Sequence, residues 1–97
     1  IPDLPDNQVV ETFAHVDGSG ISPLALGPVP HPIAGLVQSL AEYQLLAGQA
    51  AWEGTRKDAL RALLANPLCR NLNTLATVYD ELASAHRQYL PDRLLQH

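Results

Sequence analysis

The sequence predicts a mostly helical α+β fold, in which an N-terminal β-hairpin precedes three helices. Two runs of β-branched and apolar residues flank the turn-forming stretch 17–20, which reads Asp-Gly-Ser-Gly and is typical of a hairpin. A nearly uncharged helical segment then follows a proline-rich stretch. Two further segments repeat apolar residues at helical spacing and end near Pro67 and Pro91. Together these patterns predict the order hairpin, helix, helix, helix.

Residues 1–8 contain two prolines and several turn formers, so we expect an extended N-terminal segment. Residues 9–30 are predicted to form the hairpin, with strands at 9–16 and 21–26. Pro23 cannot donate a hydrogen bond to a neighbouring strand, which places the second strand at a sheet edge. Neither face of the first strand is purely polar, so both faces could be covered. A two-stranded ribbon is marginally stable alone in water.

The three helices are expected within residues 31–91. The first should run from about Ile33 to Trp52, with Pro32 in its first turn and Glu42 as its only charge. One interpretation makes it the central helix of a small bundle. The other, which we favour, is that one face docks on a missing domain or a second subunit, because 97 residues can hardly cover a helix that is apolar nearly all round.

The second helix is predicted to be about ten residues long. Gly54 should end the preceding helix as a C′ glycine, and Thr55 with Asp58 resembles a capping box. Asn66 and Pro67 should stop the second helix. Its outer face is expected to be basic, from Arg56, Lys57 and Arg61.

The third helix shows the clearest amphipathic pattern of the chain. Asn71 or Asn73 is its expected N-cap and Pro91 should close it. Residues 92–97 are expected to be a frayed tail. The apolar stripe of this helix recurs over about five turns at Leu72, Leu75, Ala76, Tyr79, Leu82, Ala83, His86 and Leu90.

Length and composition suit one domain over residues 1–97 with a modest core. Charged residues make up 16% of the chain, below the average of roughly 25%, which suggests surface meant for a partner. The chain begins with Ile1 and Pro2 and contains no methionine. We therefore expect it to be a fragment of a larger protein.

Charge and cysteine content exclude several classes of partner. The net charge is −4 and the six Lys and Arg residues are scattered, which argues against nucleic-acid binding. No apolar run is long enough to predict a membrane span. The single cysteine, Cys69, fits a reducing, cytoplasmic setting.

The residues predict no catalytic, cofactor-binding or metal-binding set. The four histidines (His15, His31, His86 and His97) all lack another His or Cys three or four residues away, the spacing typical of metal sites. His31, which lies among prolines in a predicted loop, is the candidate for a substrate-side role, although a loop residue without a role is the simpler interpretation. His86 lies on an apolar stripe, where a bond to tyrosine or backbone is the expected arrangement.

Other possible chemistry is weaker still. Asp80 and Glu81 are neighbours that point in different directions on a helix, so they cannot act as an opposed carboxylate pair and are expected on a solvated face. Cys69 has no adjacent base. Gly18 and Gly20 lie in a hairpin without a following helix, so they do not form a phosphate-binding loop.

Four stretches together resemble the C-terminal region of family 4 glycoside hydrolases. They are 4–11 (LPDNQVVE), 20–30 (GISPLALGPVP), 59–68 (ALRALLANPL) and 85–91 (AHRQYLP). The resemblance covers roughly Leu4 to Pro91, and the nearest branch is the 6-phospho-β-glucosidases. Each motif is short, so the resemblance depends on their order and spacing.

The resemblance implies NAD- and metal-dependent chemistry, with manganese as the common metal. Family members oxidise the sugar at C3, remove the C2 proton, eliminate the aglycone, add water and reduce again, an exception to the two-carboxylate scheme. The nucleotide loop, the metal ligands and the tyrosine base lie upstream of the matching region, so none maps onto this chain. Cys69 does not match the family's metal cysteine. In the family, this region is the last part of an α+β substrate domain and contributes to subunit contacts.

Three hypotheses follow. The first is the C-terminal domain of an NAD- and metal-dependent 6-phospho-β-glucosidase that hydrolyses phosphorylated disaccharides, inactive alone, with a structural role and with the rest of the enzyme and a second subunit as partners. The second is a free-standing helical protein-interaction module. The third is a small catalytic domain that uses His31 or His86. The residues leave the anomeric and aglycone preference open.

Overall fold

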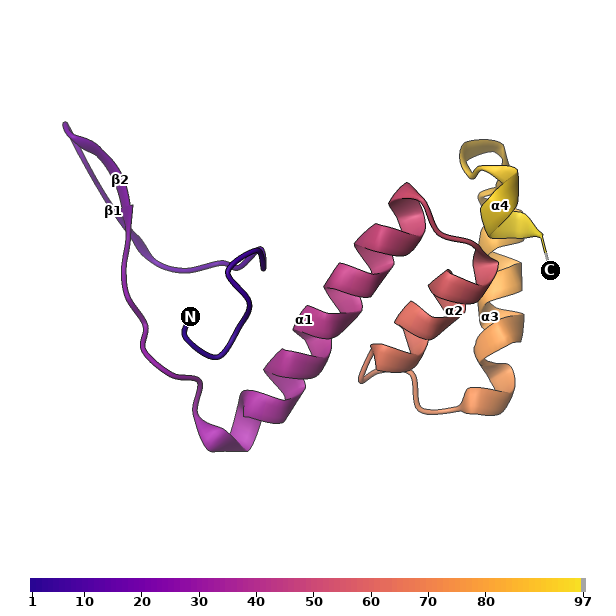
Figure 1. Ribbon diagram of the computed structural model, residues 1–97, viewed down its shortest axis with the longest axis horizontal. Coiled ribbons are helices and arrows are strands. Elements are labelled where there is room, and N and C mark those ends of the chain that lie inside the picture. The colour runs from indigo at the N-terminus through magenta and orange to yellow at the C-terminus, as the bar shows by residue number, and fades with distance from the viewer. Residues whose placement is uncertain (97) are drawn as a thin grey trace. The chain divides into compact units, whose positions relative to one another are not determined.

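The computed structural model describes residues 1–96 and confirms the predicted fold class, a two-stranded antiparallel hairpin followed by helices (Figure 1). The described chain forms two compact units, 1–38 and 39 onwards. The division falls inside helix α1 (His31–Trp52). His97, one of the four histidines considered above, lies outside the described residues.

The hairpin consists of β1 (Ala14–Asp17) and β2 (Gly20–Pro23), which are shorter than the predicted strands. The two strands pair in the register Asp17 with Gly20, so a two-residue loop connects them. The carboxylate of Asp17 accepts a hydrogen bond of 2.8 Å from the Ser19 backbone N–H, and Gly20 has a φ of 127° that L side chains rarely adopt. All eight strand residues are exposed.

The extended segment expected at residues 1–8 is wrong, because two turns form there: the Leu4 N–H donates to the Ile1 carbonyl at 3.2 Å and the Gln8 N–H donates to the Pro5 carbonyl at 3.0 Å. The Asp3 carboxylate accepts a hydrogen bond of 2.7 Å from the Val29 backbone N–H, which joins the start of the chain to the segment that follows the hairpin. The Leu24 N–H donates to the Phe13 carbonyl at 2.8 Å, so the ladder continues one pair beyond the assigned strands. These contacts organise the unit 1–38 without burying any large side chain.

Helix α1 begins at His31, two residues earlier than predicted, and ends at Trp52 as expected. Gly54 follows it at the C′ position, as predicted, but without the positive φ that glycine often adopts there. A Cβ at this position would lie 2.6 Å from the Ala50 Cα. The glycine is therefore required by a close backbone approach at the end of α1.

Helix α2 (Arg56–Ala65) has the predicted length and the predicted start. The Asp58 carboxylate accepts hydrogen bonds of 2.9 Å from both the backbone N–H and the hydroxyl of Thr55. These two bonds and the nearby Arg61 guanidinium lower the pKa of Asp58. Thr55 and Asp58 thus pair across the first turn of the helix, as the sequence indicated.

The predicted basic outer face of α2 is wrong in one residue. The side chain of Arg56 is only 14% exposed and makes a bidentate pair with Asp80 of α3 (Leu72–Ala85), with N–O distances of 2.7 and 2.8 Å. This contact raises the pKa of Arg56. The expectation that Asp80 lies on a purely solvated face is therefore also wrong.

Helix α3 begins as predicted, with the Asn71 side chain accepting from the Asn73 N–H at 3.0 Å. It ends at Ala85 instead of running to Leu90, because the chain tightens into a 3-10 turn at Arg87–Tyr89. The expected frayed tail is also wrong for residues 92–96. Helix α4 (Asp92–Leu95) forms there and buries Leu94.

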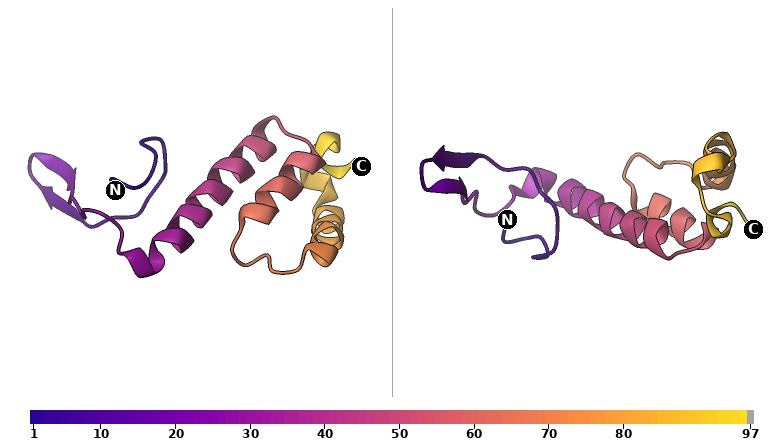
Figure 2. Two further views of the ribbon diagram at one scale, coloured as in Figure 1. Left: turned by 60° about the horizontal axis from the view of Figure 1, so that its bottom comes forward. Right: turned by 90° about the horizontal axis from the view of Figure 1, so that it is seen from above.

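The helices α2, α3 and α4 pack on one another (Figures 1 and 2). Small side chains allow close approach between helices, and the buried residues are mostly of this kind: Ala41, Ala50, Ala62, Leu75, Ala83 and Leu94. The core of the described chain therefore lies wholly in the helical unit. No helix within residues 1–96 is long and apolar enough to cross a membrane.

Candidate functional site

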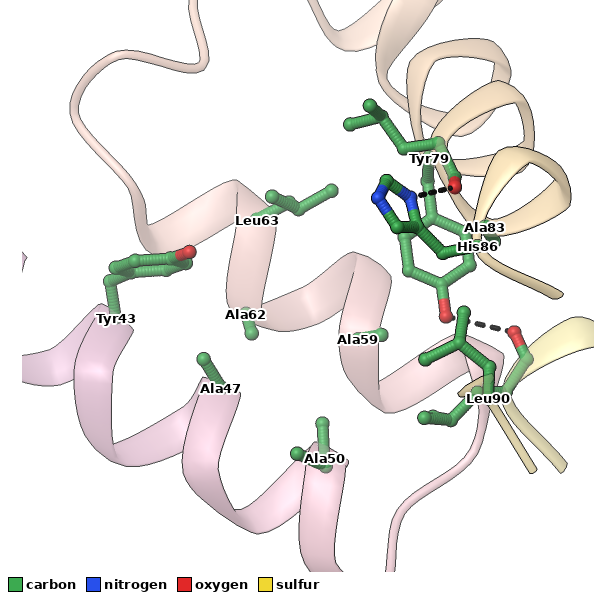
Figure 3. Close-up of a pocket in the computed structure, with 13 residues that line it drawn as sticks. Tyr43, Ala47, Ala50, Ala59, Ala62, Leu63, Tyr79, Ala83, His86 and Leu90 are labelled. Atoms are coloured by element: carbon green, nitrogen blue, oxygen red, sulfur yellow. Dashed lines mark hydrogen bonds between the residues drawn. The ribbon is translucent and has the colours of Figure 1, made fainter. Parts of the chain in front are cut away.

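An apolar groove lies in the helical unit (Figure 3). It has a volume of about 330 Å³ and is lined by residues of α1, α2 and α3, with Leu90 and Leu94 also in the lining. Alanines from all three helices line it, and their short side chains leave space between the helices unfilled. The labelled lining residues include Tyr43, Ala47 and Ala50 of α1, Ala59, Ala62 and Leu63 of α2, and Tyr79, Ala83 and His86 of α3.

Two polar side chains at the groove are held by backbone carbonyls. The Tyr79 hydroxyl donates to the Leu94 carbonyl at 2.8 Å, and burial raises the pKa of Tyr79. The His86 Nδ1 lies 2.9 Å from the Leu82 carbonyl, as expected for a backbone-bonded histidine (Figure 3). A carbonyl only accepts, so Nδ1 is the donor in this bond.

The groove does not have the arrangement that nucleophilic or acid–base catalysis needs. Such catalysis requires a nucleophile within hydrogen-bond reach of a base. Here the one hydroxyl and the one imidazole proton that are ordered by hydrogen bonds both point at carbonyls. An apolar groove with these fixed polar groups is suited to packing against apolar side chains.

Arg93 of α4 fastens the last turn of α1. Its guanidinium donates to the carbonyls of Ala51 at 2.8 Å, Trp52 at 3.0 Å and Ala50 at 3.1 Å, and it also donates to the carbonyl of Gly54. The last carbonyls of a helix have no partner within the helix and carry partial negative charge, so a cation is favourable there. Arg93 therefore holds α4 against the C-terminal end of α1, next to the groove.

The sequence did not single out Arg93. It lies in the stretch that was expected to be frayed, two residues after Pro91. A basic residue that approaches a helix end from a distant part of the chain leaves no local pattern. The apolar residue Leu94, which follows Arg93, was the one sequence signal that this segment packs against the other helices.

Among the candidate residues from the sequence that the structure describes, all but one are absent from the lining of the groove. His31 is exposed and is the first residue of α1, in place of the predicted loop position. His15 is exposed on β1, where its Nε2 lies 3.1 Å from the Asp17 carboxylate. Glu81 is exposed and Cys69 is half-buried without a disulfide. The exception is His86, which lines the groove.

The described residues do not fit a metal ion or a dinucleotide. Within residues 1–96, no three His, Cys, Asp or Glu side chains are close enough to hold a metal ion. Gly18 and Gly20 stand in a tight hairpin followed by strand β2. A phosphate-binding loop needs a helix N-terminus directly after the glycines. No catalytic step is therefore assigned to either group on these residues.

The family model for the "Family 4 glycosyl hydrolase C-terminal domain" matches residues 1–69. The chain belongs to this family. The resemblance drawn from the sequence is thereby confirmed. The match spans the hairpin, α1 and α2, so the glycosyl hydrolase C-terminal domain includes both the unit 1–38 and the first half of the helical unit.

Three curated relatives support the same family. The chain is 34% identical over 91 residues to a probable 6-phospho-beta-glucosidase of Bacillus subtilis. It is 28% identical over 89 residues to the phospho-alpha-glucosidase PagL of Clostridium acetobutylicum, and 28% identical over 90 residues to the 6-phospho-beta-glucosidase BglT of Thermotoga maritima.

The matches cover 94%, 92% and 93% of this chain but only 21%, 20% and 22% of the respective relatives. The chain thus spans about a fifth of the length of the glycosyl hydrolases that it matches. No solved structure gives a significant match.

Proposed function

We propose that this chain is the C-terminal part of a phospho-glycosidase and acts as its structural support. Membership of the glycosyl hydrolase C-terminal domain family is the observation that carries this proposal. The geometry agrees with it, because the groove of the helical unit is apolar and its Tyr79 and His86 protons are directed at carbonyls. The catalytic groups would be supplied by the part of the enzyme that the chain does not cover.

The proposed substrate is a 6-phospho-β-glucoside. The relative with 34% identity is described as a probable 6-phospho-beta-glucosidase, as is one of the two relatives at 28% identity. The third relative is a phospho-alpha-glucosidase. The β preference is therefore the finer part of the proposal, and the phosphorylated glucoside is the part that all three names share.

Membership of the family also implies NAD and a divalent metal, manganese in our proposal, for the whole enzyme. The part of the enzyme that this chain does not cover would bind both; within residues 1–96, no three His, Cys, Asp or Glu side chains are close enough to hold the metal. We further propose a cytoplasmic enzyme, because phosphorylated sugars are intracellular metabolites and the single cysteine fits a reducing compartment.

Self-association is part of the same proposal. Large apolar side chains stay exposed on both units, among them Phe13 at 78% and Trp52 at 86% exposure. Exposed apolar side chains in such number are typical of interaction surfaces. The rest of the enzyme and a second subunit are the proposed partners that cover them.

The test is an assay of the full-length gene product that contains this chain. With NAD and Mn²⁺ present, we expect hydrolysis of a chromogenic 6-phospho-β-glucoside and slower or no hydrolysis of the 6-phospho-α-glucoside and the unphosphorylated glucoside. The 97-residue chain alone should be inactive. A product that binds an unrelated protein and hydrolyses none of these substrates would favour an interaction module instead.

A further inference from the structure

The register of the hairpin determines which backbone groups point away from it. The Leu24 N–H bonds to the Phe13 carbonyl, so these two residues form a hydrogen-bonded pair. In an antiparallel ladder, hydrogen-bonded and non-hydrogen-bonded pairs alternate. Following the register toward the turn, the non-hydrogen-bonded pairs are Ala14 with Pro23 and Val16 with Ile21. The N–H and C=O groups of these residues therefore face outward.

The two outer edges consequently differ. The β1 edge presents the N–H and C=O groups of both Ala14 and Val16. The β2 edge presents those of Ile21 but only the carbonyl of Pro23, which has no N–H. Because Pro23 stands in a non-hydrogen-bonded pair, its missing N–H removes no hydrogen bond between β1 and β2. The same missing N–H disfavours the addition of a further strand at the β2 edge.

The β1 edge shows no such protection. It contains no proline and no lysine, and all four of its residues are exposed. Val16 and Ile21 form a cross-strand pair on one face and are 69% and 75% exposed. An unprotected edge beside exposed β-branched side chains is a template for strand addition.

We propose that the β1 edge is the docking site for a third strand, which comes from the part of the same enzyme that this chain does not cover. The sheet order would be third strand, β1, β2, with Pro23 ending the sheet. The third strand would bond to Ala14 and Val16 and place an apolar side chain beside Val16. This inference rests on the proposed function.

The same polypeptide is the favoured source of the strand because of length. The relatives extend over about five times the matched region, and the matching family model describes a C-terminal domain. The longer protein therefore has ample sequence to supply one strand. A covalently connected strand also meets β1 at a high effective concentration, whereas a second copy must be recruited from solution.

Amide hydrogen exchange tests the source of the strand directly. In the full-length protein, the amides of Ala14 and Val16 should exchange roughly 100-fold more slowly than in the isolated chain, while Ile21 should exchange rapidly in both. Protection of Val16 that appears in the isolated chain and grows with its concentration would assign the edge to a second copy and overturn the proposal. Protection of Ile21 alone, or of neither residue, would also overturn it.

Two proline substitutions give a matched pair in the full-length protein. Val16→Pro and Ile21→Pro each remove one outward N–H and no bond within the hairpin. We expect Val16→Pro to lower the thermal midpoint clearly and Ile21→Pro to lower it little; equal effects would count against the proposal. The glycosidase assay is a separate readout, so a protected β1 edge in a protein without that activity would reject the proposed function and leave the edge assignment standing.

Discussion

The two units of the chain differ in how they bury apolar surface. All the buried residues within 1–96 lie from Ala41 onwards, in the helical unit. The eight residues of β1 and β2 are all exposed, although half of them are apolar or proline. The helical unit therefore has its own core. The hairpin forms a strand pair, but no other element buries its apolar side chains within the unit 1–38.

The physical reason lies in the geometry of each element. A helix can bury a stripe against two neighbours at once, and alanines such as Ala62 and Ala83 let those neighbours approach closely. A two-stranded sheet offers two faces and two edges, and nothing in residues 1–38 is large enough to cover them. The comparison suggests that one unit folds by itself and the other folds with a partner.

Separation of the two units should have the largest effect. A fragment of residues 39–97 should keep a cooperative thermal transition in circular dichroism, because it retains every buried residue of the described chain. A fragment of residues 1–38 should lack hairpin structure in water, because a lone two-stranded sheet is marginally stable. Chemical shifts of Val16 and Ile21 in the shorter fragment provide the measurement for the hairpin.

The intact chain is the control for this experiment. If the fragment 1–38 shows chemical shifts typical of strands at low concentration, then the hairpin is stable without a partner. The proposed difference between the two units would then be wrong. A loss of the cooperative transition in 39–97 would contradict the other half of it.

Arg93→Ala should clearly destabilise the helical unit. It removes hydrogen bonds from a charged donor to the last carbonyls of α1, and we expect a loss of about 2–3 kcal/mol in the free energy of unfolding. Urea titration of the intact chain measures this loss. Arg87→Ala, at an exposed site in the 3-10 turn, is the matched control and should change stability little. Equal losses would show that α4 is not anchored by Arg93.

The sequence was sufficient to predict elements whose causes are local. The turn at 17–20, the pairing of Thr55 with Asp58 and the cap by Asn71 all depend on residues within three positions of one another. Their positions were accordingly correct. The family resemblance was also visible in the sequence, since it depends on the order of short motifs.

Features that depend on contacts between distant segments could not be predicted. Arg56 was placed on an outer face because its partner Asp80 is 24 residues away, and the tail was expected to fray because the contacts of Arg93 lie about 40 residues away. The groove results from the same distant packing.

Two glycines in the helical unit should respond in opposite directions to alanine. A Cβ at Gly54 would lie 2.6 Å from the Ala50 Cα, so Gly54→Ala should cost about 1–3 kcal/mol through forced backbone movement. Gly48 is exposed inside α1, and a Cβ there would meet no atom within 4 Å, so Gly48→Ala should stabilise by up to about 1 kcal/mol. Thermal midpoints of the two variants provide the measurement. Stabilisation by Gly54→Ala would show that the end of α1 is loose.

Lowering the pH should destabilise the start of α2 by protonating Asp58, and we expect this to be the smallest of the predicted effects. Its folded pKa is lowered by the Thr55 backbone and hydroxyl bonds and by Arg61, so its carboxylate stabilises the fold above the ordinary value of 3.8. That contribution is lost as the pH falls through the lowered pKa.

Asp58→Asn should therefore be less stable than the unmodified chain at neutral pH, and the difference should shrink as the pH falls below about 4. Urea midpoints measured from about pH 7 to about pH 3 follow this difference. Asp6→Asn, at an exposed site in the other unit, should leave the profile unchanged. A difference between Asp58→Asn and the unmodified chain that is constant across this range would mean that the carboxylate charge is not what stabilises the helix start. The Asp17 carboxylate of the unit 1–38, whose pKa the Ser19 hydroxyl and N–H lower, would then be the next group to substitute.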